Sequence, residues 1–240
     1  IFDQSNPEIM GSRPGVVSIT DFASFSSPGG ISVQVTVGDV TYGMVASSLN
    51  AGRDQPFAYD HAAAAFRAIS GITAANSPLT PASTGDWTPP TMASIGALII
   101  VTHPGFPGGA TKFGVLDITT PSAPIWSAGD LATNPLASTP RAVANFRNRA
   151  WFAVDNTAVY SDVLAATTRT LASQSLTLGD SANILGFSGL PVQTTSSGIV
   201  QALVAFKDFQ VWQITGDPVG GTLAQNYLSL IVGTSSPRSI

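Results

Sequence analysis

Short apolar runs alternate with polar turn sequences along most of the chain. Residues 31–37 (Ile-Ser-Val-Gln-Val-Thr-Val) alternate apolar and polar side chains with a period of two, which is typical of a half-buried β-strand. Residues 211–214 and 227–232 are rich in β-branched and aromatic residues, so they are also predicted to be strands. The dipeptides Asp155-Asn156 and Lys207-Asp208 lie between apolar runs, where hairpin turns are expected. The pattern therefore predicts short strands joined by tight turns.

One layout, an apolar run followed by a turn and a second apolar run, recurs along the sequence. It occurs at residues 98–102 with 113–118, 151–154 with 158–162, 203–206 with 209–214 and, more loosely, 42–46 with 57–60. The first runs begin at residues 42, 98, 151 and 203, so the repeat is about 50 residues long, which is the length of a β-propeller blade. We therefore expect one propeller-like region over residues 1–240, with repeat units at about 31–72, 95–127, 141–187 and 199–240.

Two segments interrupt this layout. Residues 60–67 begin with an aspartate that can act as an N-cap and continue through four alanines, which predicts a short helix on a loop between strands. Residues 73–91 are rich in Pro, Thr, Ser and Ala, and we interpret them as an extended connection between blades, with a domain linker as the alternative. The large residues of the last two repeats are expected in strands and mostly in the core: Trp151, Phe152, Val154, Leu203, Val204, Phe206, Val211, Trp212 and Ile214.

Composition supports an all-β class. The acidic residues are thirteen Asp and one Glu, and the basic residues are eight Arg and two Lys, so the best surface helix formers are nearly missing. The 23 Gly and 17 Pro supply the turns that many short strands need. No apolar run has the roughly 18 residues that a membrane-spanning helix requires. Because the sequence starts and stops at an isoleucine, we expect a processed or partial chain of a larger protein.

The residues that could carry chemistry are scattered. His61 and His103 are 42 residues apart, which is not the spacing of a helical metal pair. Residues 215–218 faintly resemble the Asp-box of sialidases, but they lack its aromatic residue. The paired Gly at 29–30, 108–109 and 220–221 lack the Lys-Ser/Thr that follows a phosphate-binding loop. Most acidic candidates lie beside turn residues: Asp39, Asp54, Asp60, Asp86, Asp117, Asp130, Asp155, Asp162, Asp180, Asp208 and Asp217.

We therefore expect no enzymatic activity and no catalytic, cofactor-binding or metal-binding residues. The local basic cluster, residues 147–149, is interpreted as a hairpin turn with solvated charges, with a contact to a neighbouring subunit as the alternative. The tryptophans are expected in the core or between blades rather than on a ligand platform: Trp87, Trp126, Trp151 and Trp212. Only 10% of the residues are charged, against about 25% in a typical soluble domain, and large permanent interfaces are depleted in charge. This composition favours a building block of an assembly.

The sequence also resembles the tail nozzle (tail tubular or hub) proteins of short-tailed bacteriophages, a group related to packaged-DNA stabilisation proteins. The resemblance is carried by Gly11-Ser-Arg-Pro-Gly15, by residues 149–154 with 159–162, by 202–206 with 211–216, and by 232–240. It implies a virion protein that forms a homo-oligomeric ring, expected to be a hexamer, at the end of the tail. It further implies contacts with other tail or connector proteins and tail fibres, and a lumen through which DNA passes without specific binding. A mildly acidic chain, with a pI of about 4.8, suits such a conduit.

Two other functions are compatible with a propeller. One is a carbohydrate-binding or glycan-degrading propeller, which would use acidic pairs and aromatic platforms. The other is a secreted propeller that acts as an interaction scaffold outside any virion.

Overall fold

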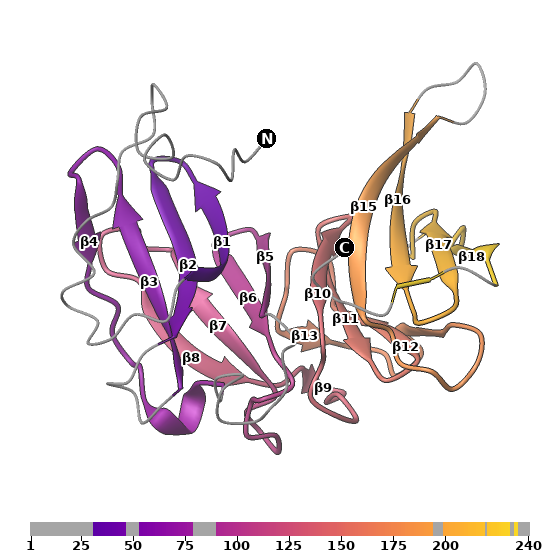
Figure 1. Cartoon of the computed structure of the whole chain (residues 1–240), viewed down its shortest axis with the longest axis horizontal. Coiled ribbons are helices and arrows are strands. Elements are labelled where there is room, and N and C mark those ends of the chain that lie inside the picture. The colour runs from indigo at the N-terminus through magenta and orange to yellow at the C-terminus, as the bar shows by residue number, and fades with distance from the viewer. Residues whose placement is uncertain are drawn as a thin grey trace, which may run out of the picture.

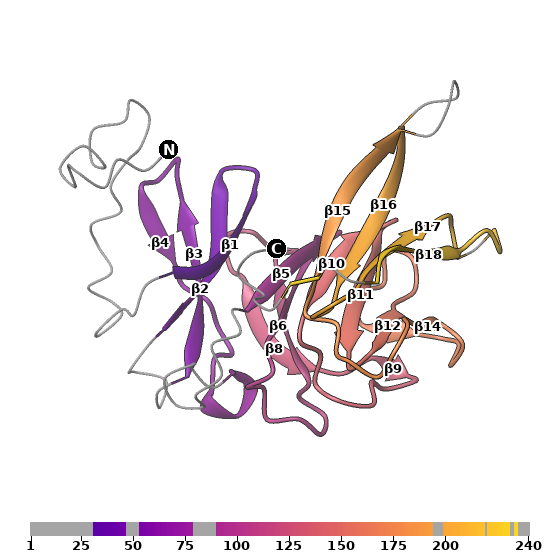
Figure 2. The same cartoon turned by 45° about the vertical axis from the view of Figure 1, so that its right-hand side comes forward.

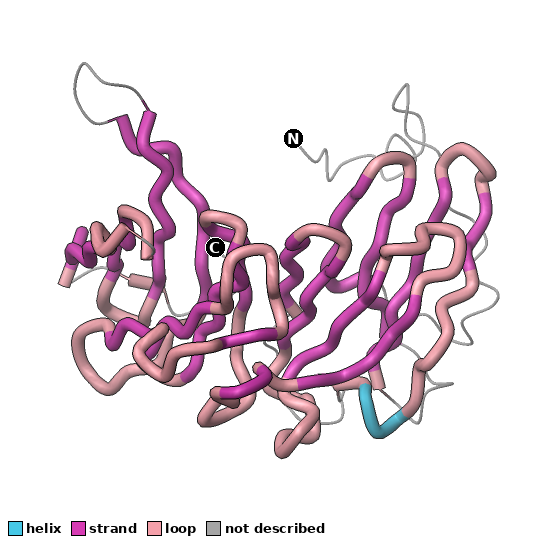
Figure 3. The backbone as a smooth tube through the Cα atoms, turned by 180° about the vertical axis from the view of Figure 1, so that it is seen from behind, coloured by secondary structure: helices cyan, strands magenta, loops and turns pink. Residues whose placement is uncertain are grey.

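The computed structural model describes residues 31–46, 53–78, 90–193, 199–218, 220–230 and 233–234. Within these ranges the regular structure consists of β-strands and one short 3-10 helix, η2 (Ala74–Asn76), as Figure 3 shows. The predicted all-β class is therefore confirmed. In this part of the chain no helix is long and apolar enough to cross a membrane.

Sixteen of the described strands form four antiparallel sheets, and in each sheet the strands keep the order of the chain, with β13 (Thr168–Arg169) left out of the third sheet. The first sheet contains β1 (Ile31–Val37), β2 (Val40–Ala46), β3 (Asp54–Asp60) and β4 (Ala65–Arg67). The second contains β5 (Thr91–Ile95), β6 (Leu98–Thr102), β7 (Phe113–Asp117) and β8 (Ile125–Gly129). The third contains β10 (Val143–Phe146), β11 (Arg149–Val154), β12 (Thr157–Tyr160) and β14 (Ser175–Thr177). The fourth contains β15 (Gly186–Gln193), β16 (Ile199–Phe206), β17 (Val211–Thr215) and β18 (Ala224–Ser229).

Tight turns connect the strands of each sheet. Arg147 and Asn148 both have φ near 55° between β10 and β11, which is the geometry of a type I′ hairpin turn and matches the twist of the strands. Asp155 and Asn156 separate β11 from β12, and Lys207 follows β16, so the two expected turns are confirmed. The alternating segment 31–37 is β1, also as expected. A small parallel pair, β9 (Ala132–Thr133) with β13 (Thr168–Arg169), lies outside the four sheets.

The first strands of the four sheets lie near one another in chain order. β1 contacts β5, β5 contacts β10, and β10 contacts β15, as can be followed in Figures 1 and 2. Consecutive sheets also pack face to face, because each presents an apolar face to the next. One buried cluster lies between the first and second sheets, one between the second and third, and one between the third and fourth.

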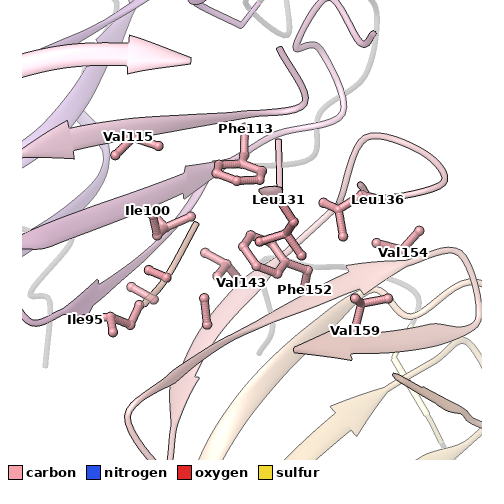
Figure 4. Packing of buried hydrophobic residues seen from close by; sticks show 13 residues of the cluster. Ile95, Ile100, Phe113, Val115, Leu131, Leu136, Val143, Phe152, Val154 and Val159 are labelled. Carbon is pink, nitrogen blue, oxygen red and sulfur yellow. The ribbon is translucent and has the colours of Figure 1, made fainter. Parts of the chain in front are cut away.

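The cluster between the second and third sheets shows how this packing works (Figure 4). The rings of Phe113 from β7 and Phe152 from β11 lie 5.0 Å apart between centroids. Ile100 and Val143 join them from β6 and β10, and Leu131 joins from the connection after β8. All five side chains are buried, and apolar burial of this kind contributes about 1.5–3 kcal/mol for each large aliphatic or aromatic side chain.

Glycine is required where Trp126 lies against β7. A Cβ placed on Gly114 would be 2.0 Å from the Trp126 ring, so only glycine lets the indole lie flat on the strand. The indole Nε1 donates a hydrogen bond of 2.9 Å to the carbonyl oxygen of Asn76. The chain before η2 also pairs with β8, since Trp126 N donates to Ser70 O at 2.8 Å. The segment around Ser70 therefore covers the outer edge of the second sheet.

The core expectations are largely confirmed. Six of the nine residues expected in the core are buried: Trp151, Phe152, Val154, Leu203, Val204 and Ile214. Phe206, Val211 and Trp212 are partly buried, although all three lie in strands. The last strand begins earlier than predicted, since β18 covers Ala224–Ser229 rather than residues 227–232, of which 231 and 232 lie outside the described residues.

The predicted helix at residues 60–67 is wrong. The chain ends β3 at Asp60, turns, and returns as β4, in which Phe66 pairs with Tyr59. Asp60 Oδ1 accepts hydrogen bonds from the backbone N–H groups of Ala62 and Ala63, so its capping ability closes a turn instead of starting a helix. Four alanines are too few to offset helix nucleation, whereas strand pairing places Phe66 against the Tyr59 ring at 5.2 Å.

The sheets and the expected repeat units differ in their boundaries. The second strands begin at residues 40, 98, 149 and 199, so they are 58, 51 and 50 residues apart. β5 begins at Thr91, before the expected unit 95–127, and β15 crosses from the expected unit 141–187 toward the next. Of the expected connection 73–91, residues 74–76 form η2, and residues 79–89 lie outside the described residues.

Candidate functional site

The two histidines stand on different sheets and have local partners. His103 is buried after β6, and its Nδ1 accepts a hydrogen bond of 2.8 Å from the backbone N–H of Gly105. His61 is exposed after β3, where its Nε2 lies 2.8 Å from Thr41 Oγ1 and its ring contacts Tyr59 edge-on. Among the described residues no group of three or more His, Cys, Asp or Glu could hold a metal ion.

Most of the candidate aspartates close turns. Asp117 Oδ1 accepts the backbone N–H of Thr119 at 2.8 Å, and the hydrogen bonds from Thr119 lower the pKa of its carboxyl group. Asp130 Oδ1 accepts the backbone N–H groups of Leu131 and Leu136. Asp60 forms an ion pair of 2.6 Å with Arg67, and the hydrogen bond from Arg67 lowers the pKa of Asp60. These contacts make the acids structural groups of the loops.

Asp54 is the exception. Its side chain is 1% exposed at the start of β3, and neither carboxylate oxygen has a hydrogen-bond partner. Burial raises the pKa of this carboxyl group to about 6. The sequence placed Asp54 among the turn aspartates, but its backbone N–H is bonded to Pro78 O and its side chain enters the interior. Asp86 lies outside the described residues.

Both lysines of the chain connect segments internally. Lys207 Nζ is completely buried and donates to the carbonyl oxygens of Leu178 and Asp180 at 2.6 and 2.8 Å. Its third bond is the ion pair with Asp180 Oδ1 at 2.6 Å, which joins the fourth sheet to the end of the third. Lys112 Nζ binds Asp130 Oδ2 at 2.8 Å and also donates to Leu136 O. The chain's two lysines therefore add little positive charge to its surface.

The basic cluster at residues 147–149 divides between surface and core. Arg147 is exposed in the turn, with its guanidinium 5.7 Å from the centre of the Phe146 ring. Arg149 is buried, so the expectation of a solvated charge at this position is wrong. Its Nη1 donates to Ser161 O at 2.7 Å, and its guanidinium lies 5.6 Å from the centre of the Tyr160 ring. All six residues of β11 are buried, because the third sheet is covered by the second sheet on one face and by the fourth sheet on the other, so a charge on β11 is buried on either face.

The other described candidates, among the tryptophans and glycines, lie in the core or in turns. Trp126 and Trp151 are buried between sheets, Trp212 is partly buried beside the same cluster as Trp151, and Trp87 lies outside the described residues. Gly108 and Gly109 are turn residues with positive φ, and Gly216 packs against Thr222 O, which a Cβ would approach to 2.1 Å.

A shallow cavity of about 360 Å³ lies at the edge of the first sheet. Phe57, Phe66, Ile69 and Ile72 form its apolar wall. The guanidinium group of Arg67 is engaged with Asp60 and with the carbonyl oxygen of Pro121, so its donors are directed away from a ligand. The cavity therefore offers few polar groups for orienting a small molecule.

The outer edge of the fourth sheet differs from the other three outer edges. β4 and β14 have three residues each, and the edge of β8 is covered by the segment around Ser70. β18 has six residues and no charge, and residues 224–228 are all exposed. Tyr227 and Leu228 are 63% and 54% exposed. A long, uncharged edge strand is a template for pairing with another chain.

The same sheet carries a projecting arm. β15 and β16 pair over eight residues, from Gly186 with Phe206 to Gln193 with Ile199, but β17 pairs only with residues 203–206. Residues 190–193 and 199–202 therefore extend as a two-stranded ribbon, which stands away from the other sheets in Figures 1 to 3. No other described strand pairs with this ribbon. Its sequence from Ser181 to Phe206 contains no charged residue.

The exposed edge strand β18 and the arm were not predicted from the sequence, although the low charge of this region was visible there. Between residues 181 and 237 the only charged residues are Lys207, Asp208 and Asp217. Permanent protein interfaces are depleted in charge in the same way.

Comparisons with known proteins add no assignment. No protein-family model matches the sequence, and no curated protein matches it significantly.

Proposed function

We propose that the four sheets are consecutive blades of a β-propeller, and that the chain is a structural subunit of a larger assembly. Three observations support the propeller. Each sheet is an antiparallel meander of four strands, consecutive sheets pack face to face, and their first strands contact one another in chain order. In a propeller the first strands of the blades surround the central axis.

The observation that carries the assembly is the exposed, uncharged edge strand β18. Monomeric proteins protect such edges with charge, short strands or covering segments, and the first three sheets use short strands or a covering segment. The fourth sheet does not, since β18 is long, uncharged and exposed. A subunit whose last sheet is covered by a neighbour explains this contrast.

The assembly that we propose is the tail nozzle of a short-tailed bacteriophage. The basis for this choice is the sequence resemblance carried by residues 149–154, 159–162, 202–206 and 211–216. Within such a ring the subunit would contact further copies of itself, other tail or connector proteins and tail fibres. A net charge of −4 suits a wall past which DNA must slide, because phosphate groups are not held by it.

The direct test is the composition of purified phage particles. Peptide mass spectrometry should detect the chain in them, and a particle map should place it in a ring at the end of the tail. Its absence from particles would reject the nozzle. Incubation with host polysaccharide provides the second arm: release of sugar products that stops when a single Asp is replaced would show a glycan-degrading propeller instead. In solution, sedimentation of the isolated chain should show self-association at neutral pH.

A further inference from the structure

The two unusual features of the fourth sheet are complementary to one another. The arm, residues 190–193 with 199–202, has two strands whose outer edges pair with no other described strand. β18 has an outer edge with no described partner strand. Both are uncharged, so neither carries the repulsion that would keep edges apart.

The arm is too thin to be stable by itself. A two-stranded ribbon in water is marginally stable, and strands gain independent stability from a third strand or a packed face. Its base is held by the body, since Ala202 is buried and the residues of β16 that follow the arm, Leu203 and Ala205, are buried against the third sheet. The next four residue pairs would extend about 13 Å at the usual rise of a strand. A neighbouring chain is the natural source of the third strand.

We propose that the arm of one copy pairs with β18 of a second copy of this chain, so that the fourth sheet of each copy is extended by its neighbour. This inference rests on the proposed assembly and names its contact. The occupant is a second copy because both halves of the contact, the arm and the unprotected edge, are present in one sequence. Backbone hydrogen bonds supply the attraction, as in other cases of strand addition.

Such a contact is heterologous, because different surfaces of the two copies meet. Heterologous contacts continue from copy to copy and close into a ring when the rotation allows. One arm buries less than the 1,200–2,000 Å² or so of a stable pairwise interface. Each contact is therefore weak alone, and every copy in a ring makes two of them. Tyr227 and Leu228, now exposed, would be covered at each contact.

The chain contains no cysteine, so a single introduced thiol reports one contact. Two full-length variants are made: Gln201→Cys in the arm and Asn226→Cys in β18, both at exposed positions. They are mixed and oxidised with diamide, and the disulfide-linked dimer is measured. Pairing brings the two strands within the Cα separation that a disulfide needs. The control pair combines Gln201→Cys with Ile125→Cys, because Ile125 is an exposed residue of β8 in the second sheet.

The expected result is at least tenfold more dimer from the Gln201→Cys and Asn226→Cys pair than from the control pair. Equal yields would overturn the inference. A second measurement uses a variant in which residues 192–200 are replaced by Asn-Gly, with circular dichroism as the folding control. It should sediment as a monomer at concentrations at which the unmodified chain associates.

The outcomes separate the two proposals. If the shortened variant still associates like the unmodified chain, the arm contact is wrong and the assembly stands. If the unmodified chain itself remains a monomer and both cysteine pairs give equal yields, the assembly and its contact are both wrong.

Discussion

Lys207 Nζ lies 2.6 Å from Asp180 Oδ1, with the lysine side chain fully buried and the aspartate side chain 54% exposed. The ion pair joins the loop after β14 to the turn after β16 and so fastens the fourth sheet to the third. The two partners differ in role. The carboxylate is close to solvent, whereas the buried ammonium donates to the carbonyl oxygens of Leu178, which is buried, and of Asp180.

Replacement of Lys207 by methionine should therefore lower the free energy of unfolding by about 2–4 kcal/mol, because it removes three hydrogen bonds and leaves the carbonyl oxygen of buried Leu178 without this donor. Chemical denaturation measures the change. Asp208→Asn, at the exposed neighbouring position, is the matched control and should change little. A Lys207→Met protein as stable as its control would show that the buried contacts contribute nothing.

Asp54→Asn should stabilise the protein at neutral pH. The pKa of Asp54 is raised from 3.8 to about 6 by burial, so folding favours the protonated form. The stability that this group contributes is complete below pH 3.8 and is lost as the pH rises through 6. A shift of two pKa units corresponds to at most about 3 kcal/mol. The Asn variant should lack this loss when unfolding is measured between pH 4 and 7.

Asp117→Asn provides the control of opposite sign. Hydrogen bonds from Thr119 lower the pKa of Asp117, so its stabilising effect is present above the unfolded pKa and is lost as the pH falls through the folded value. If Asp54→Asn and Asp117→Asn alter the pH profile in the same direction, the assignment of Asp54 as a buried, unpaired acid is wrong.

Truncation of Trp151 to alanine should cost about 3–5 kcal/mol, since the indole is fully buried. Its Nε1 also donates to Phe146 O at 3.1 Å, and its ring lies 4.5 Å from that of Tyr160. Trp212→Ala should cost less, because Trp212 is only partly buried. Urea denaturation of both variants tests the order. A larger effect at Trp212 would mean that this side chain contributes more to the cluster between the third and fourth sheets than its partial burial suggests.

Gly114→Ala should destabilise the protein by about 1–3 kcal/mol, because the new methyl group would collide with the Trp126 ring at 2.0 Å. Gly189→Ala is the matched control: it is also in a strand, and nothing lies within 4 Å of the position of its Cβ. Thermal unfolding compares the two. Equal melting temperatures would show that the indole can move away from β7 without loss.

Strand positions could be predicted from the sequence where the pattern was local. The alternation at 31–37 predicts β1, and the apolar run 98–102 predicts β6. Both predictions succeed because the polarity of successive side chains in a strand reports which of its faces are buried. The turn at Asp155-Asn156 was equally local. For the candidate site, the sequence showed that residues 181–237 contain few charges. It did not show that this stretch forms an exposed edge strand and a projecting arm.

By itself, the sequence determined the all-β class, most strands of the last two repeats and the shortage of surface charge. Tertiary structure alone decided which strands share a sheet and which charges are buried. Residues 60–67 become a turn and β4 because pairing with β3 offers backbone hydrogen bonds that a four-alanine helix cannot match. Asp54, Arg149 and Lys207 are buried among segments that are distant in sequence, around Pro78, Ser161 and Leu178 respectively, and their own sequence neighbours resemble those of exposed charges. The burial of these charged side chains depends on contacts between segments that are distant in sequence, so the local pattern of residues could not reveal it.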